Sequence, residues 1–239
     1  MPATARDIRR HDQPALAVDL VIMTIEKGLI LTLLQKREDA GKVGGTHGLP
    51  GSILHIDETL DQCAHRILRT KVGIDDAFFE QLRTFSALER DPRGRVVSVA
   101  YFALVPHEIF HRAVKSHHSL ETGVVQYLGL DDEGPAAAIR TLKDVPIRMA
   151  FDHGRIIATT IQRLRGKLDY SGVGFELLPA QFTLRDLQDI HETLLAETLS
   201  KPAFRKKMRD RGLVRPTGKR ERGKAFRPAE LYERVRGGS

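Results

Sequence analysis

The 239-residue sequence predicts an α+β fold in two parts, a mixed α/β first part and a smaller, helical and basic second part. Strand-like and helix-like segments alternate through the first 146 residues, and two short capped helices follow between residues 183 and 212. From Ser200 onward the chain carries 14 Lys and Arg against four Asp and Glu, a net charge of +10, whereas the whole chain carries +7. The positive charge is therefore concentrated in the second part, which indicates a polyanionic partner there.

Two β-rich runs open the first part, Ala15–Ile25 and Leu29–Lys36. Lys27-Gly28 separates them, and a two-residue connection that contains glycine is typical of a β-hairpin. Asp19 interrupts the apolar run of the first strand, and that run is too short to cross a bilayer as a helix.

A helix is expected next, beginning near Glu58 and ending at Gly73, after a glycine-rich loop over residues 39–51. Strands are expected at Glu80–Leu88, Val96–Val105 and Val124–Leu130, with a turn at Asp91-Pro92-Arg93-Gly94. We expect Pro135–Pro146 to be a connection. An amphipathic helix over Phe151–Leu168 should open the second part, so the predicted domains are residues 13–146 and 147–239.

The second part shows the spacing of a helix-turn-helix. Thr183 and Asp186 form a potential capping box for one helix, and Ser200, Pro202 and Gly212 are start and stop signals for the next. In that second helix Ala203, Phe204 and Met208, with Leu213 after it, are expected to face the core. Its basic residues then point outward, as a helix that contacts DNA requires.

A basic loop bracketed by Gly218 and Gly223, with apolar returns at Phe226, Leu231 and Tyr232, suits a β-hairpin wing. A basic helix beside a basic wing favours binding of double-stranded DNA over two alternatives, a solubilising tail and a helical bundle with a solvated cationic face. A homodimer on a two-fold operator is expected, because one such module reads only a few base pairs. The residues expected to contact DNA are Lys201, Arg205, Lys206, Arg209, Lys219, Arg220 and Arg222.

The stretch PGSILHIDETLDQCAHRILRTKVGI, residues 50–74, resembles a Nudix box over residues 52–74, with Glu58, Arg66, Leu68, Gly73 and Ile74 in pattern positions. The resemblance implies an opening glycine where Ser52 stands and glutamates where Ile67, Thr70 and Lys71 stand. In the family those glutamates collect around Mg²⁺, a cation that prefers oxygen ligands. Their replacement predicts no catalytic residue, no metal or cofactor, and hydrolysis that is very weak or absent.

The whole chain, over residues 13 to 235, resembles the Nudix-related transcriptional regulators of the NrtR family. Stretches such as EQLRTFSALERDPRGRVVSVAYFALV and FTLRDLQDIHETLLAETLSKPAFRKKM carry the resemblance. It implies a Nudix-like α/β/α sandwich with a mixed sheet, followed by a winged helix-turn-helix. It also implies a repressor of NAD-related or sugar-utilisation genes, with ADP-ribose or another phosphorylated sugar as effector.

Two other functions remain open at this point. One is a Nudix hydrolase, similar to an ADP-ribose pyrophosphatase, with an accessory basic domain. The other is a nucleic-acid-binding module whose Nudix-like half is purely structural. The residues expected to meet the ligand of a sensor are Arg37, Glu58, Arg66, Arg93 and Arg95. For Arg66 the alternative is a salt bridge to Glu58 alone, and for Arg93 it is a solvated turn charge.

His107-Glu108-x-x-His111 matches the zinc-protease signature, and His117 stands at the third-ligand spacing of its longer form. That longer form needs glycine where Val114 stands, so a surface segment with several histidines is favoured over a zinc site. The single cysteine, Cys63, and the lack of an apolar signal sequence predict a protein of the cytoplasm.

Overall fold

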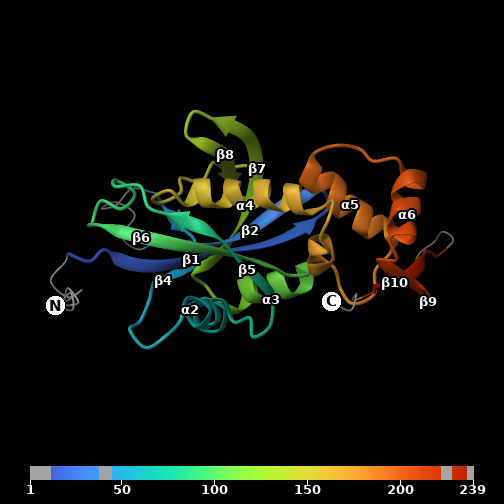
Figure 1. The fold of residues 1–239 in the computed structure, drawn as a ribbon, viewed down its shortest axis with the longest axis horizontal. Coiled ribbons are helices and arrows are strands. Elements are labelled where there is room, and N and C mark those ends of the chain that lie inside the picture. The colour runs from blue at the N-terminus through green and yellow to red at the C-terminus, as the bar shows by residue number, and fades with distance from the viewer. Residues whose placement is uncertain (1–11, 38–44, 222–227, 236–239) are drawn as a thin grey trace, which may run out of the picture.

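The computed structural model describes residues 12–37, 45–221 and 228–235. A mixed sheet forms the centre of the first part (Figure 1). β1 and β6 pair in parallel, from Ala15 opposite Val96 to Met23 opposite Leu104, and the other pairs are antiparallel. The strand order is β5 (Phe78–Phe85), β6 (Val96–Leu104), β1 (Ala15–Glu26), β2 (Leu29–Lys36), β7 (Leu120–Asp131) and β8 (Gly134–Arg140), with β3 (His47–Gly48) on β2 and β4 (Gly51–Ile53) on β1.

The expected hairpin is β1 and β2, joined by Lys27 and Gly28. Both connecting residues have positive φ, 51° and 75°, and such a turn matches the right-handed twist of the flanking strands. The hairpin prediction is confirmed, and it places the tip of β1 and β2 at the end of the sheet nearest the second part (Figure 1).

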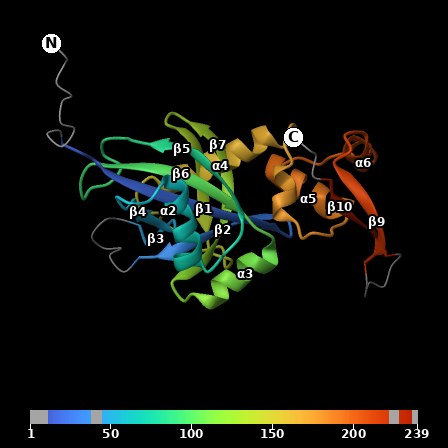
Figure 2. The ribbon, with the colours of Figure 1, turned by 60° about the horizontal axis from the view of Figure 1, so that its bottom comes forward.

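Helices cover both faces of the sheet, as the alternation of side chains along β1 requires. Val18, Leu20 and Ile22 point into the core beneath α2 (Leu60–Ile67) and α3 (His107–Ser116). Val21, Met23 and Ile25 point into the opposite core, beneath α4 (His153–Lys167). The sheet is therefore the middle layer of an α/β/α sandwich, with α2 and α3 on one side and α4 on the other (Figures 1 and 2). Helix α4 falls within residues 147–239, the predicted second part, but its buried side chains pack on the sheet of the first part.

Helix α2 begins at Leu60, two residues after the predicted start near Glu58. Thr59 is its N-cap and forms a capping box with Gln62. The Glu58 carboxylate does not cap the helix, because it accepts from the backbone N–H of His55 and from the guanidinium of Arg66. The helix continues as a π-helical turn, Leu68–Val72, and ends at Gly73 with φ of 71°, as expected.

The prediction of a connection over Pro135–Pro146 is wrong for its first half, which forms the edge strand β8. Its three alanines, residues 136–138, have low β-propensity, so only the pairing with β7 fixes their conformation. Pro135 is tolerated because it stands near the start of a strand at the edge of the sheet.

After α4, the second part contains a short 3₁₀ segment and two helices that precede a β-hairpin: η3 (Val173–Leu177), α5 (Leu184–Leu195), α6 (Lys201–Asp210), β9 (Val214–Arg220) and β10 (Glu230–Arg234). The predicted capping box of Thr183 and Asp186 is present. Ser200 occupies the N-cap of α6, but its side chain makes no capping hydrogen bond. Phe204 and Met208 are buried as expected, whereas Ala203 is exposed, because its position is one residue away from the buried face.

One continuous core joins the two parts, since Ile161 and Leu164 of α4 belong to the same cluster as Leu187 of α5 and Phe204 of α6. A domain boundary between residues 146 and 147 stays a prediction. Gly223 and Phe226, on which part of the wing prediction rests, lie outside the described residues. Among the described residues, no helix is both long and apolar enough to cross a membrane.

Candidate ligand cleft and nucleic-acid interface

A cleft of about 560 Å³ lies where β1, β2 and β4 meet the start of α4. Such a volume is within the usual range for small-molecule sites. Two carboxylates line it, those of Asp19 and Asp91, against five basic side chains. The excess of positive charge suits an anionic ligand. The basic residues are Lys36, Arg37, Lys71, Arg90 and Arg93.

Asp19 is the centre of a buried charge network in the floor of this cleft. Its Oδ2 accepts from Ser98 Oγ at 2.6 Å, and it lies 3.4 Å from Arg90 Nη2 and 3.6 Å from His153 Nε2. Burial alone raises the pKa of Asp19, but His153, Ser98 and Arg90 together outweigh it and lower the pKa to about 2. Asp19 is thus a fixed negative charge that holds three neighbouring segments together.

The start of α4 forms one wall of the cleft. Leu49 N donates to His153 Nδ1 at 2.9 Å, which leaves Nε2 to carry the proton on the side of Asp19. Phe151 has φ of 53°, an uncommon conformation for a side chain of its size. Its ring centroid lies 4.6 Å from the Arg37 guanidinium and 5.1 Å from that of Arg93. The ring therefore holds two arginines in the cleft through cation–π contacts.

Of the five residues predicted to bind a ligand, the structure brings Arg37 and Arg93 together in the cleft. Arg93 is also held by Asp91, with Nε–Oδ1 and Nη2–Oδ2 distances of 3.0 and 2.8 Å. Arg95 is not among the residues that line this cleft, and it donates to the carbonyls of Ser86 and Ala87.

Glu58 and Arg66 bind each other, with Arg66 Nε 2.9 Å from Glu58 Oε2 and Arg66 Nη2 2.5 Å from Oε1. Arg66 Nη1 also donates to Ser52 Oγ, and its side chain lines a separate hollow on α2. Arg66 thus forms the salt bridge with Glu58, and it also bonds to Ser52, Ile53 and Cys63. A direct contact of any of the five residues with a ligand remains a prediction.

The side chains at the box positions do not fit Mg²⁺. Ile67 is fully buried, Thr70 Oγ1 donates to the carbonyl of Arg66 at 2.7 Å, and Lys71 Nζ donates to the carbonyl of Gly51. Glu58 is occupied by Arg66. Within residues 12–37, 45–221 and 228–235, no three His, Cys, Asp or Glu side chains gather as metal ligands would.

The histidines of the zinc-protease signature lie on α3, a helix on the outside of the sandwich. His111 Nε2 lies 2.7 Å from Glu26 Oε2, and His107 Nε2 lies 3.4 Å from Glu108. His117 is instead next to the carbonyl of Ala113. Each of the three histidines therefore has a different protein contact.

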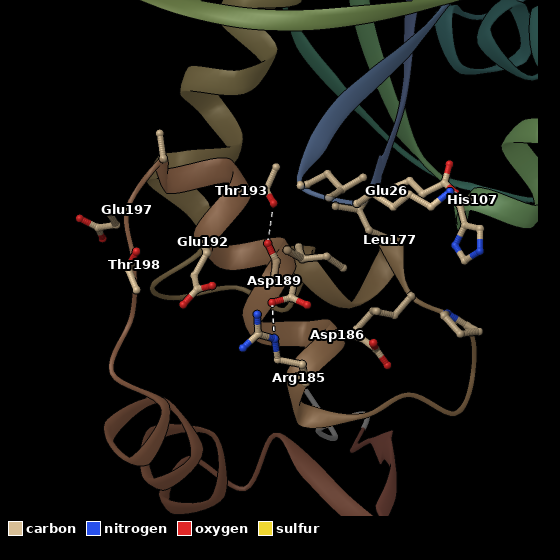
Figure 3. A pocket seen from close by; sticks show the side chains of 17 residues that line it. Glu26, His107, Leu177, Arg185, Asp186, Asp189, Glu192, Thr193, Glu197 and Thr198 are labelled. Carbon is tan, nitrogen blue, oxygen red and sulfur yellow. Dashed lines mark hydrogen bonds and ion pairs between the residues drawn. The ribbon is translucent and has the colours of Figure 1, made fainter. Parts of the chain in front are cut away.

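A larger cavity of about 780 Å³ lies between the β1–β2 turn, the start of α3 and helix α5 (Figure 3). Its charge is opposite to that of the cleft, because five carboxylates line it against the cations Lys27 and Arg185. Arg185 is itself paired with Asp189 at 2.7 Å. This cavity at the junction of the two parts is therefore unsuited to a phosphate-bearing ligand. The carboxylates are those of Glu26, Asp186, Asp189, Glu192 and Glu197.

Helix α6 and the β9–β10 hairpin form the basic surface of the second part. Lys201, Lys206 and Arg209 are exposed on α6, with Lys206 Nζ 3.3 Å from Asp210. Arg205 is half-buried. A hydrogen bond to Glu230, and then burial, raise the pKa of Tyr232 on β10, whereas the charges of Arg209 and Arg205 lower it.

On the wing, Lys219 and Arg220 are exposed, and Arg220 Nη1 donates to the carbonyl of Pro228 at 3.0 Å. Arg222 lies outside the described residues. Lys207 of α6 binds the carboxylate of Asp169, and Arg211, at the C-cap of α6, binds the backbone carbonyl of Asp169. These two cations hold α6 against the loop that follows α4.

Comparison with known proteins agrees with both halves. The family model for the Nudix domain matches residues 13–145, and the family model for the NrtR DNA-binding winged helix domain matches residues 174–233. The chain is 34% identical to the "ADPR responsive transcriptional repressor NtrR" of Acinetobacter baylyi, over 93% of this chain and 82% of that protein. The chain belongs to the NrtR family.

Other similarities extend over most of this NrtR-family chain. The crystal structure of Shewanella oneidensis NrtR complexed with a 27mer DNA matches it with a TM-score of 0.75 and 31% identity, over 92% of this chain and 93% of that one. An ADP-ribose pyrophosphatase of Methanocaldococcus jannaschii is 26% identical over 64% of this chain and 78% of its own length. The α/β/α sandwich followed by a winged helix-turn-helix is thereby confirmed.

Proposed function

We propose that this NrtR-family chain is a transcriptional repressor whose binding to an operator is controlled by ADP-ribose or a related phosphorylated sugar in the cleft. The observation that carries the proposal is one continuous helix, α4, between two basic sites. It begins in the cleft at His153 and packs at its other end against α5 of the winged helix part. The Acinetobacter relative named as ADPR responsive and the Shewanella relative crystallised with DNA support both partners.

The proposal includes a cleft without hydrolytic activity. Water activation and neutralisation of a pyrophosphate in Nudix enzymes depend on a metal, and the side chains of the box described above do not supply its ligands. The rival function is a hydrolase with an accessory basic domain, which the similarity to an ADP-ribose pyrophosphatase favours. Release of AMP from ADP-ribose with Mg²⁺ at ordinary turnover would select the rival function.

A cytoplasmic homodimer and genes of NAD or sugar metabolism belong to the same proposal. A winged helix presents one recognition helix, so two copies are needed to read a two-fold operator. A monomer bound to DNA, measured by light scattering, would contradict the dimer.

The decisive experiment titrates ADP-ribose into a complex of the full chain with DNA from upstream of its own gene, followed by fluorescence anisotropy. The expected result is a saturable change in DNA affinity of about 5- to 150-fold, the usual range for coupling between two sites. Ribose, which lacks phosphate, is the control and should have no effect. If no phosphorylated sugar alters the DNA affinity, the chain is instead a DNA-binding module whose Nudix half is purely structural.

A further inference from the structure

Lys71 occupies a position of the box where the family resemblance implies a metal-binding glutamate. It lies on the π-helical turn Leu68–Val72, and its side chain reaches across to β4, where Nζ donates to the carbonyl of Gly51. Lys71 lines the cleft together with Arg37 and Arg93. An ammonium group has three N–H donors, so after the bond to Gly51 two N–H groups of Lys71 can donate hydrogen bonds to a ligand.

The partner of Lys71 is fixed by tight packing of β4 against β1. Gly51 stands opposite Asp19, and a Cβ at residue 51 would lie 2.3 Å from Asp19 Oδ1 and 3.0 Å from the carbonyl of Val18. Only glycine permits this approach. The carbonyl that orients Lys71 therefore belongs to the rigid frame of the cleft.

The charges around Lys71 oppose a metal and favour an anion. Asp19, a buried carboxylate whose charge acts on Lys71, is already bound to Ser98, Arg90 and His153. The pKa of Lys71 is lowered by burial and then by the charge of Arg66, while Asp19 raises it. A divalent cation at this place would be repelled by the ammonium. A diphosphate would find charge-assisted donors on Lys71, Arg37 and Arg93.

We propose that Lys71 replaces the divalent cation of the Nudix cleft and binds the diphosphate of the effector directly, so that binding needs no metal. This inference rests on the proposed function, since it assigns a role to one residue of the effector cleft. Lys71 would then favour ligands that carry two linked phosphates over neutral sugars.

The test is calorimetric titration of the full chain with ADP-ribose, once in EDTA and once with millimolar Mg²⁺. Wild-type affinity should agree within about twofold between the two conditions. Lys71→Met should weaken binding by about ten- to a hundredfold, which is the usual effect of losing a charged hydrogen bond. Lys71→Arg should keep most of the affinity because it keeps the charge. Lys115→Met, on an exposed residue of α3 outside the cleft, is the matched control.

Two results would overturn the role of Lys71: wild-type binding that requires Mg²⁺, or equal affinities of the wild type and Lys71→Met. Inorganic pyrophosphate, titrated in the same way, separates this role from the choice of effector. Pyrophosphate binding that Lys71→Met weakens would support the role of Lys71 even if ADP-ribose failed to bind, in which case the effector of the proposed function is wrong. If neither compound binds in EDTA, the metal-free diphosphate site is refuted.

Discussion

Arg90 and Asp152 form a two-bond ion pair, with Nε–Oδ2 and Nη2–Oδ1 distances of 3.0 and 2.7 Å. The pair joins the loop before β6 to the N-cap position of α4. Asp152 makes no capping hydrogen bond with its own helix, because Arg90 engages both of its carboxylate oxygens. Arg90 also reaches Asp19, so the start of α4 is tied to the floor of the cleft.

Arg90→Met is expected to destabilise the protein strongly. Arg90 is 7% exposed, and its removal leaves the buried Asp19 and the half-buried Asp152 without their shared cation. Loss of one partner from a buried pair costs about 3–5 kcal/mol. Unfolding in urea measures the change. Arg185→Met, which removes the exposed partner of Asp189 on α5, should cost less than about 1 kcal/mol. Equal costs for the two substitutions would refute the structural role of Arg90.

Asp19 predicts a specific dependence of stability on pH. Its pKa in the folded protein is about 2, below the ordinary value of 3.8, so its contribution is fully present above pH 4 and is lost as pH falls toward 2. The difference in unfolding free energy between the wild type and Asp19→Asn should therefore narrow by about 2 kcal/mol over that interval. A difference that stays constant from pH 5 to pH 2.5 would contradict the assignment.

Local patterns predict most helices and strands of this protein because each is specified within a few residues. The β1–β2 hairpin follows from Lys27 and Gly28, and α5 follows from the capping box of Thr183 and Asp186. Strand β8 lacks such a signal, since alanines fit a strand only once β7 offers its backbone. The contact of one strand with another is information that local periodicity does not carry.

The cleft is predicted far less completely, because its members are distant in the sequence. Asp19, Arg90 and His153 meet only after β1 pairs with β6 and α4 packs on the sheet. One signal was present, a lone aspartate within an apolar strand, which is costly to bury without partners. The sequence predicts Arg37 and Arg93 individually as ligand contacts, but it gives no signal for Phe151, which holds both.

Cys63 is expected to be nearly inert toward alkylating reagents in the folded protein. The side chain is fully buried, and burial followed by the hydrogen bond with Glu58 raises the pKa of the thiol to about 11. Because only the thiolate reacts, a rise from 9.0 to about 11 slows labelling about a hundredfold at pH 8. Mass spectrometry after iodoacetamide treatment, with and without urea, measures the rate. Rapid labelling of the folded chain would show that α2 opens readily.

The double substitution of Lys206 and Arg209 by alanine should weaken operator binding without unfolding the protein. Both residues are exposed on α6. Loss of two phosphate contacts should reduce the slope of log affinity against log salt concentration by about two. Anisotropy titrations at several salt concentrations give both the affinity and its slope. Arg112→Ala with Lys115→Ala on α3 is the matched control of equal charge. An unchanged affinity and slope would exclude this face of α6 from the interface.

Arg165 is expected to transmit the effect of the ligand from the first part to the second. It lies near the end of α4, where Nε donates to the carbonyl of Leu194 on α5 at 2.5 Å and the guanidinium lies 4.4 Å from the Tyr127 ring of β7. A shift at the cleft end of α4 would therefore reach α5 through this contact. In Arg165→Met, ADP-ribose should change DNA affinity less than in the wild type. The ratio of the affinities with and without ADP-ribose should lie closer to one by about threefold or more.

Arg163→Met is the matched control for that experiment, because Arg163 lies on the same helix but binds the carbonyl of Leu82 and lies near Glu80 in β5. It should leave the ratio within about twofold of the wild type, and neither variant should change ADP-ribose affinity of the DNA-free protein by more than about twofold. Full coupling in Arg165→Met, or an equal loss in both variants, would mean that the signal passes through the junction as a whole. The contact between Arg165 and Leu194 would then only support the packing of α4 on α5.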